Sequence, residues 1–528
     1  MLYLKKGFYL LLCACVLLTT FTGCGKKSGQ AIQYNLAQEP VTLDPQIAGD
    51  PYAKTVIMAL YEGLTRLDEN NRAAPGVAMR WESDADFTSF TFYLRTDALW
   101  SDETPVTAHD FVYAFTRAVD PKTASTMNTP MFAVKNAKSI VQGTMPASEL
   151  GVTAVNDHTL KIDLEYAYEN FPAVTALPVF MPCNQTFFEA SSGKYGLDAK
   201  HILGNGPFKM TNRYSWEHGQ YINLTAASTY RGENPVQPAT LTFSIGTLSA
   251  EEQKQLSAFA VQNAAEVEPL KQQGYSILSF EDTTWGLCFN TEQELMKESY
   301  VRRAFVQTLD REAITAYLPQ GCSIADDLIT PGMTLMGKNY RSLAGGGFYL
   351  KQDASAVQKA YAALKAAGKE KMPSVTVLCL DDPDIKKMVN EMLAAWNSAF
   401  GNYFNMEPLS RTELENRVNN GNYTVALCPI RPTDSNPTGL LSLFESNSRN
   451  NPTNLKSSVY DRALADAVGK PLEQEVSFYA QAEQYLNTEG IFYPIYYEKR
   501  NYAVAPGLTG ITVLAYDMGI DFLGAKKA

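Results

Sequence analysis

Residues able to carry acid–base, metal or nucleophilic chemistry occur in this sequence, but their spacing matches no catalytic motif. No histidine pair has the HExxH or HxH spacing that places two imidazoles on one zinc ion. There is no GxSxG elbow for a nucleophilic serine, and no GxxxxGK[ST] loop to hold phosphate. The chain has only four histidines: His109, His158, His201 and His218. We therefore predict no metal, no cofactor and no enzymatic activity.

The acidic residues leave one enzymatic alternative open. Two carboxyl groups at a suitable separation can cleave a glycosidic bond. Counting the 56 aspartates and glutamates neither isolates such a pair nor eliminates it. A secreted hydrolase is therefore the alternative to a binding protein, and turnover of a peptide or glycoside library would distinguish the two.

The first 30 residues form a separate segment. Lys5 and Lys6 precede an apolar run over residues 8–18. This run is too short to span a hydrocarbon core, which takes roughly 20 residues, so we interpret residues 1–23 as a secretory signal. Its end resembles the lipobox of bacterial lipoproteins, which implies that Cys24 carries diacylglycerol and anchors the protein on the extracytoplasmic face of the cell membrane. Residues 24–30 suit a flexible tether, and cleavage of an ordinary signal peptide nearby is the alternative.

Five cysteines remain beyond the anchor: Cys183, Cys288, Cys322, Cys379 and Cys428. Their number is odd and no CxxC spacing occurs, so neither a zinc site nor a full disulfide framework is indicated. We expect buried free thiols for most of them. One bridge is possible outside the cytosol, but the sequence does not choose its partners.

Composition and charge exclude one class of function. Hydrophobic residues make up 45% of the 528-residue chain and charged residues 19%, a globular balance with material for more than one domain. The net charge is −11. A nucleic-acid-binding protein needs a basic surface to displace counterions, so no nucleic acid is expected as a partner.

The elements that must position any site are short strands and helices in alternation. Apolar and polar residues alternate over 90–95, 160–165 and 241–245, the period of half-buried strands. Between the first two, Thr107 and Asp110 have the spacing of a capping box. They predict a helix that ends near Asp120-Pro121.

The later half of the chain reads as a helix, a strand and a second helix with short connections. The first helix begins near Asp353 and stops at Gly368, and a strand follows over 375–379. The second helix carries an apolar stripe that we expect to be core: Ile385, Met388, Val389, Met392, Leu393, Trp396 and Phe400. This order predicts an α/β lobe.

With these residues in hand, the chain resembles the family 5 solute-binding proteins, which include the oligopeptide- and dipeptide-binding receptors of ABC importers. The strongest stretch, Leu94 to Phe115, is similar to the family's W-x-D/N-G-x-P-V-T-A-x-D-F-V-Y segment, with Glu103 where the family has Gly. Further matches keep the family order: Leu43-Asp44-Pro45, Tyr61-Glu62-Gly63-Leu64, Gly151-Val152, Asp157-His158-Thr159-Leu160, Gly204-Asn205-Gly206-Pro207-Phe208, Phe289-Asn290-Thr291, Val301 to Glu312, and Pro506-Gly507-Leu508-Thr509-Gly510.

The resemblance implies an α/β, two-lobed periplasmic-binding-protein-like fold, class II-type and large, that closes over a ligand. Lobe one would comprise residues 31–61, 188–280 and 500–528, with 62–187 as an inserted subdomain, and lobe two residues 281–499. The implied function is an extracytoplasmic receptor that captures a peptide or peptide-like ligand and delivers it to an ABC transporter permease. We expect a monomer. A degenerate receptor with a non-peptide ligand is a further alternative.

The resemblance also implies where the ligand binds. In peptide-binding relatives an Asp in a W-x-x-D-Y stretch pairs with the peptide's amino group. Counting back from Pro437 puts that Asp on Thr433 and the Trp on Ile430, with Arg431 between them. A shift of one residue restores the acid as Asp434, which makes Asp434 the candidate anchor; its alternative role is to cap the turn before Asn436.

Three further positions complete the implied pocket. Met127 falls at a family pocket Tyr, and Arg411 falls at a pocket Trp. A backbone segment that binds the peptide by strand addition falls at Gly49-Asp50-Pro51. Pro51 has no N–H to donate. These substitutions predict an altered ligand preference.

Overall fold

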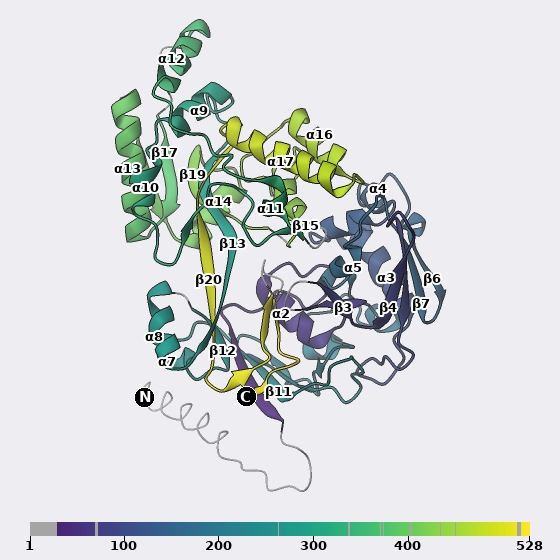
Figure 1. Cartoon of the computed structure of the whole chain (residues 1–528). Coiled ribbons are helices and arrows are strands. Elements are labelled where there is room, and N and C mark those ends of the chain that lie inside the picture. The colour runs from purple at the N-terminus through teal and green to yellow at the C-terminus, as the bar shows by residue number, and fades with distance from the viewer. Residues whose placement is uncertain are drawn as a thin grey trace.

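The computed structural model describes residues 29–68, 72–261, 263–335, 338–369, 371–372, 374–401, 404–432, 435–448, 450–514 and 519–528. The chain forms two lobes, one below and one above in Figure 1, with an additional sheet at the side of the lower lobe. Two long strands, β13 (Ser276–Phe289) and β20 (Phe492–Val504), run from one lobe into the other. They pair antiparallel, with register shifts between Glu281 and Thr283 and between Trp285 and Gly286.

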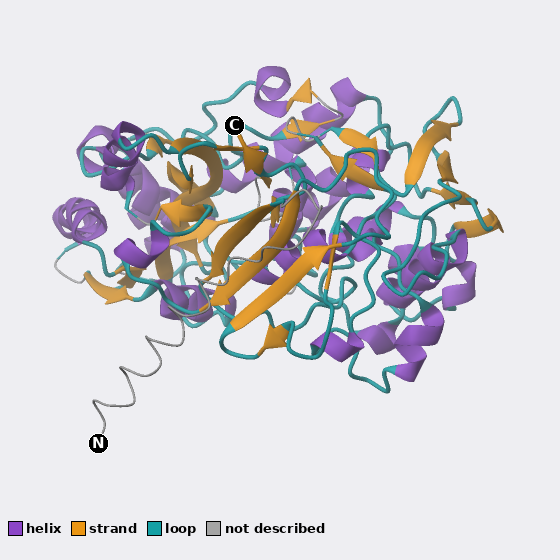
Figure 2. Cartoon of the chain, turned by 90° about the horizontal axis from the view of Figure 1, so that it is seen from below, coloured by secondary structure: helices purple, strands orange, loops and turns teal. Residues whose placement is uncertain are grey.

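The lower lobe is built on a mixed sheet in the order β1-β11-β10-β8, with β9 paired to β10. Its first strand lies parallel to β11, with Gln30 paired to Pro238, so the lobe joins distant segments of the chain. The strands are β1 (Gln30–Leu36), β8 (Phe208–Lys209), β9 (Trp216–Glu217), β10 (Tyr221–Ala226) and β11 (Pro238–Ile245). Figure 2 shows this region from below, with helices on both sides of the central strands. The expected strand at 241–245 is confirmed within β11.

The additional sheet is antiparallel, in the order β4-β5-β7-β6. The strands expected at 90–95 and 160–165 are confirmed as β5 (Ser89–Leu94) and β7 (Thr159–Asp163), which pair with each other; β4 (Ala78–Ser83) and β6 (Val152–Asn156) flank them. The expected helix is α3 (Ala108–Val119). At its start the Thr107 backbone N–H donates to Asp110 Oδ2 at 2.8 Å, which confirms the predicted cap.

The upper lobe is an α/β layer, as predicted. Its sheet runs β12-β20-β13-β19-β17-β18, with β14 paired to β20; the crossing strands extend this sheet downward, so that β12 lies in the lower lobe (Figure 1). The expected helix, strand and helix are α12 (Ala356–Ala366), β17 (Thr376–Leu380) and α13 (Pro383–Phe400). All seven residues of the predicted apolar stripe are buried. Trp396 donates from Nε1 to the Phe305 carbonyl at 2.7 Å, and their rings meet at 5.1 Å, so α13 is fixed to the core by both contacts.

The remaining elements fill in around these sheets. The strands are β2 (Thr65–Leu67), β3 (Ala73–Pro75), β12 (Ala258–Val261), β14 (Ser323–Ile324), β15 (Thr334–Leu335), β16 (Lys338–Asn339), β18 (Asn405–Leu409), β19 (Val425–Ile430), β21 (Leu508–Thr509), β22 (Thr512–Leu514), β23 (Gly519–Asp521) and β24 (Lys526–Lys527). The α-helices are α2 (Pro51–Leu60), α4 (Ala137–Val141), α5 (Phe171–Val174), α6 (Gln185–Ala190), α7 (Ala250–Gln253), α8 (Val267–Gln272), α9 (Ser299–Gln307), α10 (Arg311–Thr315), α11 (Tyr340–Ala344), α14 (Arg411–Asn419), α15 (Pro437–Leu441), α16 (Ser458–Ala467) and α17 (Leu472–Thr488). In the portion of the chain described above, no helix combines the length and apolarity that a bilayer crossing requires.

Candidate ligand-binding site

The start of α2 places the predicted backbone segment of the lower lobe. Asp50 caps this helix, because its Oδ1 accepts from the Ala53 N–H at 2.7 Å. Pro51 is the first helical residue, where a missing N–H costs the helix nothing. A Cβ at Gly49 would lie 3.0 Å from the Sδ atom of Met127. The structure therefore brings Gly49, Pro51 and Met127 together, and no larger residue fits at position 49 without displacing Met127.

Tyrosines from α2, β1 and the crossing strand β20 lie close together. Burial raises the pKa of Tyr34, and the neighbouring hydroxyls of Tyr502 and Tyr52 raise it further, while Arg500 acts in the opposite direction. Tyr52 and Tyr502 are only partly buried. Arg500 donates from Nε to the buried carboxylate of Asp282 at 2.9 Å, which joins β20 to β13. Tyr52 at the start of α2 and Tyr502 on β20 both lie near Tyr34, so the tyrosines connect the α2 segment to the crossing strands.

On the upper lobe, Glu498 of β20 gathers two of the predicted residues. Its carboxylate accepts from Arg411 Nη2 at 2.9 Å and from Trp285 Nε1 at 2.7 Å. Arg431 Nη2 lies 4.0 Å from the same carboxylate, and Arg431 Nη1 pairs with Glu415 at 3.2 Å. The Arg411 guanidinium also lies over the Trp285 ring, 5.2 Å from its centroid. The structure therefore brings Arg411 and Arg431 together through an acid that the sequence did not single out.

These contacts keep the Glu498 side chain ionised. Burial alone would raise the pKa of Glu498, but Arg411, the Trp285 N–H and Arg431 lower it below its ordinary value. Glu498 is thus a carboxylate at neutral pH. Arg411 keeps 39% of its side chain exposed although it is paired with Glu498. Ile430, the last residue of β19, is buried opposite Thr284 and contributes packing.

Three predicted residues lie outside the described part of the chain. These are Thr433 and Asp434 of the expected amino-group site, and Cys24 of the expected anchor. The other predicted residues form two groups. Gly49, Pro51 and Met127 lie in the lower lobe, and Ile430, Arg431 and Arg411 lie in the upper one.

Sequence reasoning missed the residues at the crossing strands. Trp285, Glu498 and Arg500 contribute the contacts described above, together with Tyr52 and Tyr502. The available signal was the charged Glu-Lys-Arg run at 498–500 inside an otherwise apolar and aromatic segment. Charged residues in the interior of a long strand are rarely buried without an oppositely charged partner. Such a run therefore indicates a cluster of polar residues around the strand.

The segment that follows β7 of the additional sheet also contacts the upper lobe. Asn436 Nδ2 donates to the hydroxyl of Tyr168 at 3.2 Å. A Cβ at Gly469 would lie 3.2 Å from the Cβ of Tyr166, whose ring stacks on Tyr168 with centroids 6.0 Å apart. Both tyrosines act on the buried hydroxyl of Tyr479 in α17.

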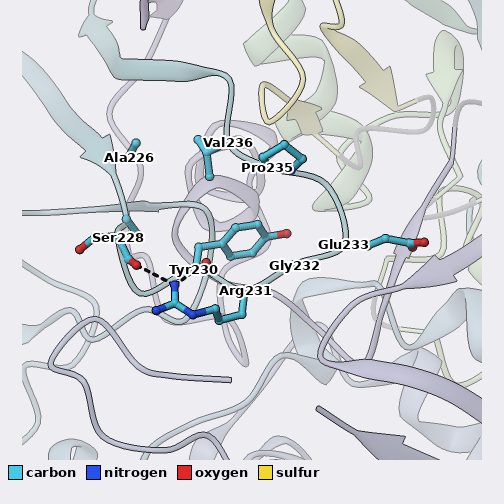
Figure 3. A pocket seen from close by; sticks show the side chains of 9 residues that line it. Ala226, Ser228, Tyr230, Arg231, Gly232, Glu233, Pro235 and Val236 are labelled. Carbon is cyan, nitrogen blue, oxygen red and sulfur yellow. Dashed lines mark hydrogen bonds between the residues drawn. The ribbon is translucent and has the colours of Figure 1, made fainter. Parts of the chain in front are cut away.

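A separate pocket opens at the loop after β10. Its volume is ≈ 560 Å³ and its lining comes from residues 226–236, none of which is a predicted site residue. Figure 3 shows Arg231 directed at the Ser228 carbonyl, to which Nη1 donates at 2.7 Å. Tyr230 donates its hydroxyl to Glu62 at 2.5 Å. The Arg231 guanidinium and the Tyr230 hydroxyl are therefore engaged within the protein, and we assign no function to the pocket.

Among the residues that the structure describes, no group of three or more His, Cys, Asp or Glu side chains could hold a metal ion. His201 pairs with Asp198, His218 with Glu39 and His109 with Asp157, so each of these histidines has one acidic neighbour.

Comparison with known proteins identifies relatives over nearly the whole chain. Residues 72–452 match the family model described as "Bacterial extracellular solute-binding proteins, family 5 Middle". The dipeptide-binding protein DppE of Bacillus subtilis is 25% identical over 484 residues, covering 89% of this chain and 88% of the relative. The periplasmic oligopeptide-binding protein OppA of Salmonella typhimurium is 28% identical over 508 residues, covering 92% and 90%. The substrate-binding domain of an oligopeptide ABC transporter from Bacillus anthracis superposes with a TM-score of 0.77 at 25% identity, covering 95% of this chain and 99% of the other.

Proposed function

Because the chain belongs to the family 5 bacterial extracellular solute-binding proteins, we propose that it captures a peptide or peptide-like ligand between its lobes and delivers it to the permease of an ABC transporter. The observation that carries this proposal is the family match over residues 72–452, on a two-lobed chain whose relatives are named as dipeptide- and oligopeptide-binding proteins. The accessible polar groups on both lobes support it. A peptide offers backbone donors and acceptors to such surfaces.

The ligand would contact both groups of predicted residues. Gly49, Pro51 and Met127 would line its lower side, with Arg411 and Arg431 on its upper side. Asp434 is the proposed partner of the ligand's amino group, because a charge enclosed between the lobes needs an opposite charge. Thr433 and Ile430 belong to the same proposed segment.

The proposal includes the location and organisation of the chain. Cys24 is the proposed lipid anchor that holds a monomeric receptor on the extracytoplasmic face of the membrane. Two acyl chains suffice for stable attachment, where one is marginal. The proposed lobe boundaries are residues 31–61, 188–280 and 500–528 for lobe one, 62–187 for its subdomain, and 281–499 for lobe two.

Calorimetry and scattering together test this function. A mixture of di- to hexapeptides should contain a binder that raises the melting temperature and shrinks the radius of gyration. At a free ligand concentration 100 times the dissociation constant, linkage gives about 2.7 kcal/mol of stabilisation. Cleavage products in the mixture would instead support a hydrolase. A thermal profile that no peptide changes would contradict peptide capture.

A further inference from the structure

Two of the five cysteines lie against each other in the core of the upper lobe. The Sγ atoms of Cys288, on β13, and Cys428, on β19, are 3.1 Å apart. Both are free thiols in the structure. They are 140 positions apart in the sequence, and their contact results from strand pairing alone. A disulfide requires about 2.05 Å between the sulfurs, so a shift of about 1 Å would suffice to bond them.

The strand register explains this proximity. Cys288 lies opposite Ala426 and Cys428 lies opposite Gly286, so the cysteines are diagonal neighbours on one face of the antiparallel pair. Gly286 contributes no side chain between them; a Cβ there would come within 2.4 Å of the Phe492 ring. Small residues around the pair therefore leave the two sulfurs in direct contact.

The other cysteines have different surroundings. Cys183 belongs to the lower part of the molecule, and its thiol is influenced by Arg117 and Asp44. The groups that act on the Cys379 thiol are Lys386 and Asp381, and those that act on the Cys322 thiol are Lys499, Glu498 and Glu281. Cys288, in contrast, has Cys428 as its chief polar neighbour. The geometry selects one pair of partners where the sequence left the choice open.

We infer that Cys288 and Cys428 are a disulfide site that closes after export and joins β13 to β19. The reaction is thiol–disulfide exchange with a disulfide-bearing oxidant, either a donor protein or a small molecule. The thiolate of Cys288 attacks the donor disulfide and releases one donor thiol; the thiolate of Cys428 then attacks the Cys288 sulfur and releases the second. Two protein thiols are oxidised and one donor disulfide is reduced to two thiols, so atoms and electrons balance.

Burial determines when this exchange takes place. Cys288 is 0% exposed and Cys428 is 1% exposed, so no oxidant reaches them in the folded lobe. Burial also raises the pKa of Cys288 well above its ordinary value, and contact with Cys428 raises it further, so the reactive thiolate is scarce after folding. Exchange must therefore occur while the lobe is folding. Disulfides persist in extracytoplasmic compartments, where family 5 proteins act.

Alkylation mapping tests the inference without any variant. Protein exported by a bacterial host is quenched in acid, denatured and treated with iodoacetamide in the absence of reductant. Mass spectrometry of the digest should show the Cys288 and Cys428 peptides joined, lighter by two hydrogen atoms than the two thiol peptides together. Cys183 should be alkylated in the same sample. Alkylation of both Cys288 and Cys428, or linkage of either one to another cysteine, would overturn the proposal.

A second measurement asks what the bridge contributes. Refolding in reductant should lower the melting temperature of the wild type by about 5 °C or more, because the bridge restrains a long loop of the unfolded chain. Cys288→Ala should abolish this dependence on reductant. Cys379→Ala, at a buried cysteine of the same sheet, should retain it. Equal melting temperatures of wild type with and without reductant would contradict the bridge, whatever ligand the protein binds.

Discussion

Asn436 and Tyr168 are 268 positions apart in the chain, and the side-chain amide of the first donates to the hydroxyl of the second at 3.2 Å. The oxygen of the same amide accepts from the Thr438 N–H at 3.0 Å and caps α15. Asn436 therefore both begins a helix of the upper lobe and contacts the lower part of the molecule. Since this contact exists only when the lobes are close, it favours the closed arrangement.

Removing the Tyr168 hydroxyl should shift the protein toward the open form. A neutral hydrogen bond contributes about 0.5–1.5 kcal/mol, so Tyr168→Phe should weaken ligand binding by roughly five-fold. The ring contacts with Tyr166 should remain. Small-angle scattering of the ligand-free variant should show a larger radius of gyration than that of the wild type. Tyr93→Phe is the matched control, because the Tyr93 hydroxyl donates to Glu82 within the same sheet and away from the upper lobe. Identical scattering of Tyr168→Phe and wild type would contradict this prediction.

Glu475 should make stability depend on pH. Burial raises its pKa from 4.5 to about 7, and the hydrogen bond that Tyr479 donates to its Oε1 at 2.8 Å lowers the pKa by less. The titratable groups that face this pair are Tyr166 and Tyr168. Because the folded pKa exceeds the unfolded one, the folded state loses stability as the pH rises from about 4.5 to about 7, and the full cost applies above 7.

Glu475→Gln should remove this dependence, because its amide oxygen can still accept from Tyr479 without carrying a charge. The variant should match the wild type in melting temperature below pH 4.5 and exceed it above pH 7. Glu473→Gln, on the exposed side of the first turn of α17, is the control and should show no such trend. A difference between Glu475→Gln and wild type that is the same at every pH would refute the assignment.

Asp434→Asn should separate ligands by their amino group. A charge-assisted hydrogen bond contributes about 1.5–3 kcal/mol, so the variant should bind a free-amine peptide roughly ten- to a hundredfold more weakly. It should bind the N-acetylated form of the same peptide as the wild type does. Calorimetric titration of both peptides into wild type and variant measures this difference. Equal weakening of both affinities would indicate that Asp434 caps the turn before Asn436 instead.

Glu103→Gly should stabilise the protein. Glu103 has φ of 74°, a left-handed conformation that costs a side chain free energy and that glycine adopts without strain. The backbone there forms a tight turn, with the Trp100 N–H donating to the Thr104 carbonyl at 2.8 Å. Glycine's greater entropy in the unfolded chain offsets part of the relieved strain, so we expect a net gain of about 0.5–1 kcal/mol in the free energy of unfolding, measured with urea. Glu103→Ala should give no gain; an equal gain from alanine would point to charge and not to backbone strain.

Cys24→Ser should release the protein from the membrane. The wild type, expressed in a bacterial host, should incorporate labelled fatty acid and sediment with membranes, and the variant should do neither. Cys183→Ser is a control for the loss of a thiol elsewhere. A wild type that is unlabelled and secreted would contradict the anchor.

Short-range sequence patterns predicted the helices and strands. The contacts of the candidate site depend on the pairing of strands that are far apart in the sequence. The Thr107 and Asp110 cap and the stripe through Trp396 could be predicted because each depends on residues a few positions apart. The Trp285 bond to Glu498 joins residues 213 positions apart on strands whose pairing no local pattern specifies. The family resemblance predicted Arg411 as a pocket residue. Its partner Glu498 could not be predicted, because the two residues are 87 positions apart and meet only in the folded lobe.

The pairing of β13 and β20 also limits how the molecule can move. Both passages of the described chain between the lobes lie in this one two-stranded ribbon, whose register shifts, at Glu281/Thr283 and Trp285/Gly286, are the places where paired strands bend most readily. A ribbon of this kind resists shear along its hydrogen bonds and yields to bending across its plane. The ribbon therefore favours a rotation of one lobe against the other over a sliding motion. A distance between labels on the two lobes would follow this rotation, and Trp285, at the second shift, would report it by fluorescence in a variant that lacks the other four tryptophans.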